Sequence, residues 1–167
     1  VLWQKHSKTM RETASLKRLY TFQDATSDDG KIENRHGWGG DLEYSGENPK
    51  SYRVVPGRWP SKKAVRLDKA PLRTKAVDLK KRSFTAEMWF RPLGPGGISG
   101  PNFGRQGTLL AVNNGFYAGW RLTMSYPQRT LTFEMARPKP IGAVAIRTIE
   151  PLTNGVWHHV AVNWDGA

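Results

Sequence analysis

Strict two-residue alternation in the segment SFTAEMWFRP, residues 83–92, is the feature that most restricts the fold of this chain. Every second residue from Phe84 to Phe90 is apolar and falls on one side of an extended chain, while the intervening residues fall on the other. Pro92 ends the segment because it has no N–H to donate to a neighbouring strand. The pattern predicts a β-strand that buries Phe84, Met88 and Phe90 on one face of a sheet.

Similar short segments recur along the chain, separated by turns rich in Gly, Pro, Asn and Asp. The alternating segments 117–126 and 130–136 are joined by a short turn, which predicts a β-hairpin with Trp120, Leu122 and Met124 on one face. Further strand candidates are LYTFQD (19–24), AVRLD (64–68), TLLAV (108–112), AVAIRTI (143–149) and VWHHVAVNWDG (156–166). Almost no helical period is visible. The sequence therefore predicts an all-β fold, a two-sheet antiparallel β-sandwich of the jelly-roll type.

Length and composition fit one domain with a short leading segment. The chain has 167 residues, of which 38% are hydrophobic, enough for a sizeable core. We expect residues 1–18 to form a linker or a short helix, and residues 19–167 to form the sandwich. The absence of Cys excludes disulfides, Cys-ligated zinc and Cys nucleophiles. No run of about eighteen apolar residues occurs, so we expect no membrane span.

Several of these segments resemble a known family. SFTAEMWFRP, GTLLAV, WRLTM, LTFEM and GVWHHVAVNWDG are similar to strand motifs of the laminin G-like or pentraxin-like jelly roll of the concanavalin A-like lectin/glucanase superfamily. The segment VVPGRWPSKKAVRLD also resembles that family, except that Lys63 stands where the family has a glycine. The likeness implies a non-catalytic module of a larger exported protein that recognises glycan or protein. The alternative is part of a polysaccharide-active enzyme with catalytic residues beyond residue 167.

The last predicted strand carries an apolar stripe that ends at Trp164 and is followed by Asp165-Gly166. In the family that the chain resembles, a further strand follows such a turn. We therefore expect the sandwich to be incomplete in this chain, and a second chain or a missing C-terminal segment to complete it. In the alternative, a smaller sandwich is self-complete, and the 64–68 and 143–149 segments flank the last strand.

The formal net charge of +12 is unevenly distributed, because residues 58–82 contain ten bases and two acids. Such a segment favours a polyanion, such as acidic polysaccharide, nucleic acid or an anionic membrane surface. The alternative is a solvated basic face that only aids solubility. The candidate patch for an anionic polymer consists of Arg58, Lys62, Lys63, Arg66, Lys69, Arg73, Lys75, Lys80, Lys81 and Arg82.

A second candidate site lies at the turn before the predicted hairpin. Asn113, Asn114, Tyr117 and Trp120 combine amide side chains with aromatic rings, which suits recognition of a sugar at the rim of a sandwich. We predict these four as ligand-binding residues. The alternative is an ordinary hairpin turn without a ligand.

Candidate metal ligands are few. Asp24, Asp28 and Asp29 offer hard oxygen ligands that suit calcium, an ion that the superfamily often binds. The alternative is an acidic turn, and no cofactor is required for binding. His158 and His159 are adjacent in a predicted strand and therefore point to opposite faces, which disfavours a shared zinc ion.

No catalytic set is visible in the sequence. Glycosidases use two carboxylates that flank the scissile bond, whereas Glu87 and Glu134 are single acids on different predicted strands. No serine lies in a nucleophile elbow. We therefore expect no hydrolase or transferase activity in this chain alone.

Overall fold

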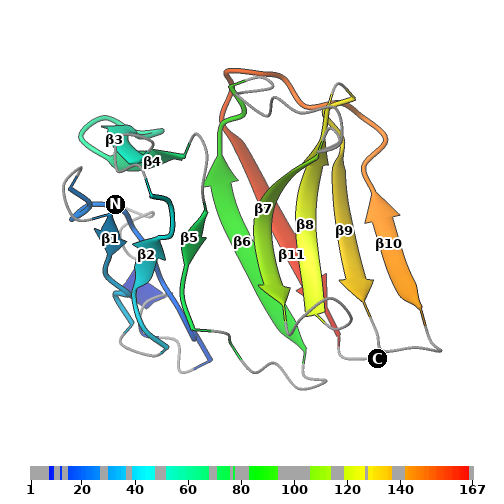
Figure 1. The fold of residues 1–167 in the computed structure, drawn as a ribbon, viewed down its shortest axis with the longest axis horizontal. Helices are drawn as coiled ribbons and strands as arrows, with labels where there is room; N and C mark the ends of the chain where they lie inside the picture. Colours follow the sequence, from blue (N-terminus) through cyan, green and yellow to red (C-terminus); the bar gives the residue numbers. More distant parts are fainter. Residues whose placement is uncertain are drawn as a thin grey trace. The chain divides into compact units, whose positions relative to one another are not determined.

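The computed structural model is all-β apart from helical backbone at Lys8, Thr9 and Glu12, which confirms the predicted fold class (Figure 1). It divides into two compact units, Val1–Lys75 and Ala76–Ala167. Among the described residues, no helix is long and apolar enough to cross a membrane. The expected division at residues 18 and 19 stays a prediction. The structure describes residues 8, 9, 12, 15–26, 30–36, 39–47, 52–67, 71–75, 77, 83–93, 106–113, 119–126, 128–136 and 142–165.

The first unit contains two small antiparallel sheets. One has the order β1-β2-β5, formed by β1 (Lys31–Ile32), β2 (Leu42–Tyr44) and β5 (Leu72–Arg73). The other is the hairpin of β3 (Tyr52–Pro56) and β4 (Lys63–Leu67). Ala25, Ile32 and Tyr52 form the buried centre of this unit. The predicted strand 64–68 therefore exists, but it pairs locally with β3.

A buried asparagine organises the loops of the first unit. Asn34 is 6% exposed, and its Oδ1 accepts hydrogen bonds from the backbone N–H groups of Leu19 (3.1 Å) and His36 (3.2 Å). The N–H of Asn34 donates to Oδ1 of Asp41 at 2.9 Å, and Lys31 Nζ lies 3.1 Å from the other carboxylate oxygen. These bonds satisfy backbone groups that no strand ladder satisfies.

The expectation of a strand over residues 19–24 is wrong. Leu19 is held by Asn34 and Arg35, which are loop partners, and Phe22 has a φ of 60°. A non-glycine residue in the left-handed region breaks an extended chain. Tyr20 and Phe22 still pack against the core of the first unit, so their apolar pattern reflects burial in a loop.

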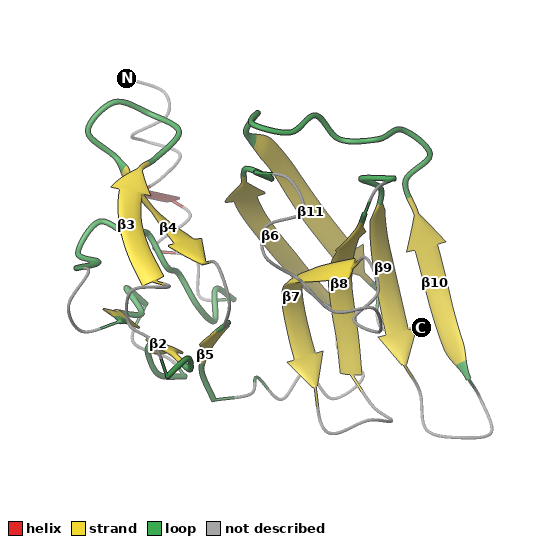
Figure 2. Cartoon of the chain, turned by 45° about the horizontal axis from the view of Figure 1, so that its top comes forward, coloured by secondary structure: helices red, strands yellow, loops and turns green. Residues whose placement is uncertain are grey.

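The second unit contains a four-stranded antiparallel sheet and a two-stranded ribbon. The sheet has the order β10-β9-β8-β7, which Figure 2 shows side by side. The ribbon pairs β11 with β6. The bounds are β6 (Phe84–Phe90), β7 (Gln106–Asn113), β8 (Gly119–Ser125), β9 (Leu131–Ala136), β10 (Ala143–Arg147) and β11 (His158–Trp164).

The core of the second unit lies between the sheet and the ribbon. Phe90 and Val162 come from the ribbon, whereas Leu122, Met124 and Leu131 come from the sheet, and all five are buried together. Burial of side chains of this size stabilises a fold by roughly 1.5–3 kcal/mol each. The two-layer arrangement confirms the predicted sandwich, and the β8–β9 pairing confirms the predicted hairpin.

The predicted alternation of the 83–92 segment is also observed. Phe90 is buried, and Phe84, Ala86 and Met88 are half-buried, whereas the residues between them are exposed. The alternative in which the 64–68 and 143–149 segments flank the last strand is wrong. β10 pairs with β9, and β4 pairs with β3, so the described partner of β11 is β6.

The edge strand β10 is exposed along its whole length. Val144 is 54% exposed and Ile146 is 68% exposed, although both are apolar. Hydrogen bonds to β9 and a bond from Arg147 Nε to Thr132 Oγ1 (3.2 Å) hold the strand in place. The position of β10 therefore depends on strand pairing more than on burial of its own side chains.

We expect Leu122→Ala to lower the free energy of unfolding by about 2–5 kcal/mol, since it removes a side chain that is 2% exposed and leaves a cavity. Urea denaturation followed by tryptophan fluorescence measures this change. Ile146→Ala is the control, because its exposed side chain predicts a change below about 0.5 kcal/mol. Equal effects of the two substitutions would contradict the assigned core.

The Asp41 carboxylate should contribute to acid sensitivity. The hydrogen bond from the N–H of Asn34, and then the nearby Lys31, lower the pKa of Asp41 below its ordinary value of 3.8. A lowered pKa stabilises the folded state above the ordinary value, and this contribution is lost as the pH falls through the lowered value. We expect Asp41→Asn to reduce the loss of stability between about pH 6 and about pH 3. Glu150→Gln, which removes an exposed carboxylate in the other unit and leaves the bond between Asn34 and Asp41 in place, is the charge-matched control.

Candidate functional site

The pairing of β6 with β11 divides the ribbon into two chemically different faces. The register places Met88 opposite Val160 on the core side, and Trp89 opposite His159 on the other side. We call this second side the outer ribbon face. It consists of Thr85, Glu87, Trp89, His159, Ala161 and Asn163.

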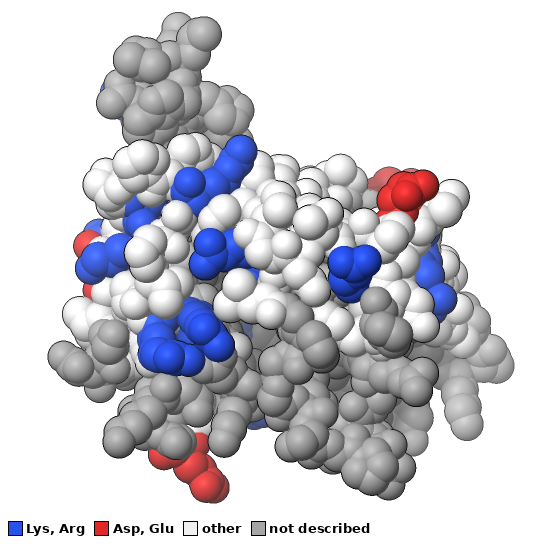
Figure 3. All heavy atoms as spheres, turned by 90° about the horizontal axis from the view of Figure 1, so that it is seen from above, with Lys and Arg blue, Asp and Glu red and all other residues white. Residues whose placement is uncertain are grey.

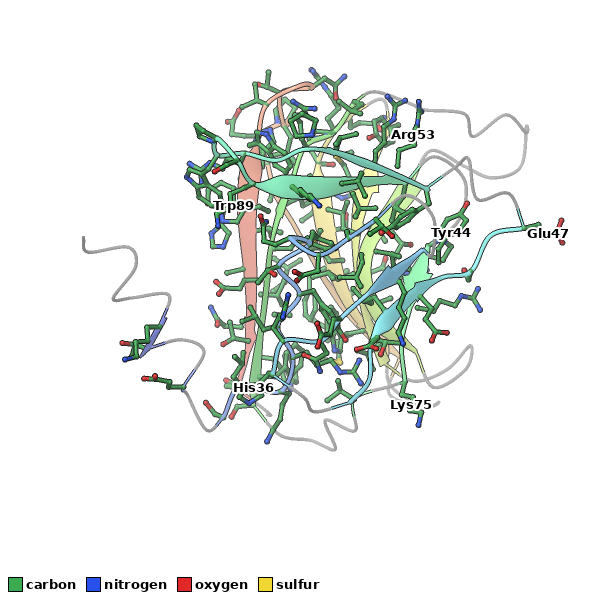
Figure 4. The ribbon with its side chains drawn as sticks, turned by 90° about the vertical axis from the view of Figure 1, so that its left-hand side faces the viewer. His36, Tyr44, Glu47, Arg53, Lys75 and Trp89 are labelled. Carbon is green, nitrogen blue, oxygen red and sulfur yellow. The ribbon has the colours of Figure 1, made fainter. Side chains whose placement is uncertain are left out.

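An exposed aromatic pair lies on the outer ribbon face. The ring centroids of Trp89 and His159 are 4.7 Å apart, with an angle of 30° between their planes. Trp89 is 36% exposed despite its size, and Figure 4 labels it on the ribbon. Because the two rings stand on directly opposed residues, the backbone register fixes their position relative to each other.

Polar groups continue the outer ribbon face on one side of the aromatic pair. His159 Nε2 lies 3.4 Å from Oε2 of Glu87, and both side chains are about half exposed at 39% and 45%. The hydroxyl of Thr85 donates to Oδ1 of Asn163 at 2.7 Å. Since this bond uses the amide oxygen, Nδ2 is the end of Asn163 that can donate to a ligand.

The aromatic surface continues at one end of the ribbon. Arg91 follows β6 and Trp157 precedes β11, so the antiparallel register brings them to the same end. The guanidinium carbon of Arg91 lies 5.4 Å from the centre of the Trp157 ring. This cation–π contact holds a second indole beside the outer ribbon face.

This arrangement suits a ligand with both apolar and polar edges. The C–H face of a sugar ring can pack on an indole, while its hydroxyls exchange hydrogen bonds with carboxylate, imidazole and amide groups. The polar side chains are already held by one another, so little side-chain freedom remains to be lost on binding. Among the described residues, no group of three or more His, Asp or Glu side chains could hold a metal ion.

The two histidines point to opposite faces, as the sequence predicts. His158 packs against Phe90, with ring centroids 5.8 Å apart, and its Nε2 lies 2.9 Å from the Thr153 carbonyl oxygen. His159 lies on the outer ribbon face with Trp89. The two imidazoles are therefore parts of different environments.

Of the four residues predicted to bind a ligand at the hairpin turn, Trp120 is the one whose side chain the structure describes. Trp120 is 8% exposed and stacks on Phe84, with centroids 5.2 Å apart, so its ring belongs to the core. Asn113 ends β7, but its side chain, Asn114 and Tyr117 lie outside the described residues. The prediction of a ligand at this turn stays untested, although Trp120 does not present an exposed ring to it.

The predicted calcium ligands are only partly described. Asp24 forms an ion pair with Arg35, and its side chain is 53% exposed. Asp28 and Asp29 lie outside the described residues. Calcium at this turn stays a prediction.

The predicted basic patch is distributed over several elements. Arg58, Lys62, Lys63 and Arg66 belong to the β3–β4 hairpin, including its turn. Arg73 is exposed on β5, and Lys75 is exposed after it. Lys69, Lys80, Lys81 and Arg82 lie outside the described residues, so a single patch of ten bases stays a prediction.

The outer ribbon face is not among the sites that the sequence predicts. Alternation already placed Trp89 opposite to the apolar side of its strand, which is a signal of exposure. The missing information was the partner strand. Only the β6–β11 register shows that His159 lies opposite Trp89 and that Asn163 lies opposite Thr85.

Comparisons with known proteins agree with the fold. A laminin G-type family model, described as Concanavalin A-like lectin/glucanases superfamily, matches residues 68–167, which is more than half of the chain. A solved structure of an S-layer domain-containing protein (residues 221–444) from Clostridium thermocellum is similar, with a TM-score of 0.58 and 20% identity. The match covers 86% of this chain and 61% of that chain. Comparison with curated proteins gives no match.

Proposed function

The chain belongs to the concanavalin A-like lectin/glucanase superfamily, and from that premise we propose that it is a non-catalytic module that binds a neutral sugar chain on the outer ribbon face. The observation that carries this proposal is the exposed Trp89–His159 pair with hydrogen-bonding side chains next to it along the same face. A flat aromatic surface beside fixed polar groups suits a pyranose ring better than a purely apolar ligand.

The arrangement of the acidic residues supports a binding role over a hydrolytic one. Glu87 lies on the outer ribbon face beside His159, while Glu134 is paired with Arg121 on the four-stranded sheet. Glu134 alternates with the core-facing Phe133 and Met135, so the core of the sandwich separates it from Glu87. Glycosidase carboxylates instead flank one bond, at roughly 5–10 Å from each other.

We further infer that the module acts outside the cytoplasm as part of a larger protein. Support comes from the family and from the similarity to an S-layer domain-containing protein, of which the chain spans 61%. Fractionation of the native cells followed by immunoblotting tests this inference. Recovery of the protein only from the cytoplasmic fraction would contradict it.

Trp89→Ala should weaken binding to the preferred neutral oligosaccharide by at least about tenfold, since it removes the largest contact surface of the site. Isothermal titration with cello-, xylo-, manno- and chito-oligosaccharides measures the affinity. Trp59→Ala is the matched control, because Trp59 is also exposed (51%) but lies in the first unit. Binding that is unchanged in Trp89→Ala, or lost equally in both variants, would refute the assigned site.

Asn163→Ala should also weaken that binding, but by less, because it removes hydrogen bonds and leaves the aromatic surface in place. The same titrations with Asn163→Ala report the loss. Asn154→Ala, in the exposed turn before β11, provides an amide control that should bind like the parent chain. If no neutral oligosaccharide binds to the parent chain, the proposed sugar ligand is wrong.

A further inference from the structure

The β3–β4 hairpin in the first unit has an unusual charge. Residues 52–67 contain Arg53, Arg58, Lys62, Lys63 and Arg66 and no Asp or Glu. We call this segment the basic hairpin. It lies outside the residues that match the family model, which begin at residue 68. Figure 3 shows one face of the molecule, on which Lys and Arg surface is far more extensive than Asp and Glu surface.

Two arginines stand opposite each other on the basic hairpin. The register pairs Arg53 with Arg66, and both are exposed. The opposite face of the hairpin carries Tyr52, Val54 and Val65, which pack in the core of the first unit. Like charges on directly opposed residues destabilise a strand pair. An anionic ligand that lies across both guanidinium groups would offset this repulsion.

The turn of the basic hairpin presents a cation together with an aromatic ring. The guanidinium carbon of Arg58 lies 4.7 Å from the centre of the Trp59 ring, and Trp59 is 51% exposed. The turn is closed by bonds from Gly57 N to Lys62 O (2.7 Å) and from Lys62 N to Trp59 O (3.0 Å).

Gly57 is required for this closure. A side chain there would place its Cβ 2.9 Å from the carbonyl oxygen of Lys63. Lys63 has a structural role as well, because its Nζ donates to the Ala25 carbonyl oxygen at 3.3 Å. The other bases of the hairpin, Arg53, Arg58, Lys62 and Arg66, have exposed side chains.

We propose that the basic hairpin binds an anionic polysaccharide, a sugar polymer that carries carboxylate or sulfate groups. A guanidinium group binds a carboxylate or sulfate through two parallel hydrogen bonds, so Arg53 and Arg66 can each bind one charged group of the polymer. The indole of Trp59 can pack on an intervening sugar ring. Proteins that bind single-stranded nucleic acids instead present several aromatic rings on which successive bases stack. Among the described residues of the hairpin turn, the one aromatic ring is that of Trp59.

The ligand test compares polygalacturonate with fully methyl-esterified polygalacturonate, which has the same backbone without its charges. We expect the full chain to bind the charged polymer, with an affinity that falls steeply between about 50 and about 200 mM salt. The esterified polymer should bind far more weakly. Equal binding of the two polymers would overturn the proposal, and so would tighter binding of poly(dT) than of polygalacturonate at the same salt concentration.

The site test uses Arg53→Gln/Arg66→Gln, which should weaken polygalacturonate binding by about tenfold and reduce its salt dependence. The melting temperature of this double variant is measured alongside, so that a loss of binding is read only from folded protein. Lys8→Gln/Lys17→Gln removes the same charge from exposed residues outside the hairpin and should bind like the parent chain. Equal losses in both double variants would show a general charge effect and overturn the assigned site.

Substitution of each exposed tryptophan distinguishes the basic hairpin from the outer ribbon face as the binding site for polygalacturonate. Trp59→Ala should lower polygalacturonate binding severalfold, while Trp89→Ala should leave it unchanged. The proposal therefore does not depend on the neutral-sugar site, and either can fail alone. Retention of full polygalacturonate binding by Trp59→Ala would refute the sugar-stacking role of the hairpin turn.

Discussion

The antiparallel pairing of β6 with β11 is the interaction on which the second unit depends. It joins segments about seventy residues apart in the chain, and its register places Met88 with Val160 and Trp89 with His159. A shift by one residue would exchange the two faces, moving Trp89 and Glu87 into the core and exposing Phe90. The same hydrogen-bond ladder thus determines both what the core contains and what the outer ribbon face offers to a ligand.

Local alternation was enough to predict the individual strands of the second unit, because a strand with one buried face must repeat every two residues. The 84–90 strand and the β8–β9 hairpin followed directly from it. The pairing of distant strands did not, since a two-residue period does not identify the partner. The failed strand over residues 19–24 has another cause, namely that side-chain bonds from Asn34 hold Leu19 in a loop.

For the candidate sites too, alternation within a strand predicts which face a residue occupies, whereas its neighbours on other strands follow only from the strand pairing. Trp120 was predicted as a ligand residue although it shares a strand face with Leu122 and Met124, and the alternation alone argued for its burial. Trp89 was not among the predicted ligand residues, although it alternates with core residues and is exposed. The residues that make Trp89 part of a candidate site are His159, which lies opposite to it, and Asn163, which lies further along the same face. Both become apparent only once the register is known. Similarly, the sequence identified the bases of the hairpin, while the opposition of Arg53 and Arg66 required the strand pairing.

The exposed strand β10 has a consequence for the behaviour of the protein in concentrated solution. Its side chains lie in solvent, and Val144 and Ile146 make much of its surface apolar. Exposed apolar edge strands are where β-proteins begin to associate through intermolecular ladders. Arg147 is the one charged residue in β10 and lies at its end, where it bonds to Thr132. Colloidal stability therefore depends on the high net positive charge of the whole chain, and it should decrease when salt screens that charge.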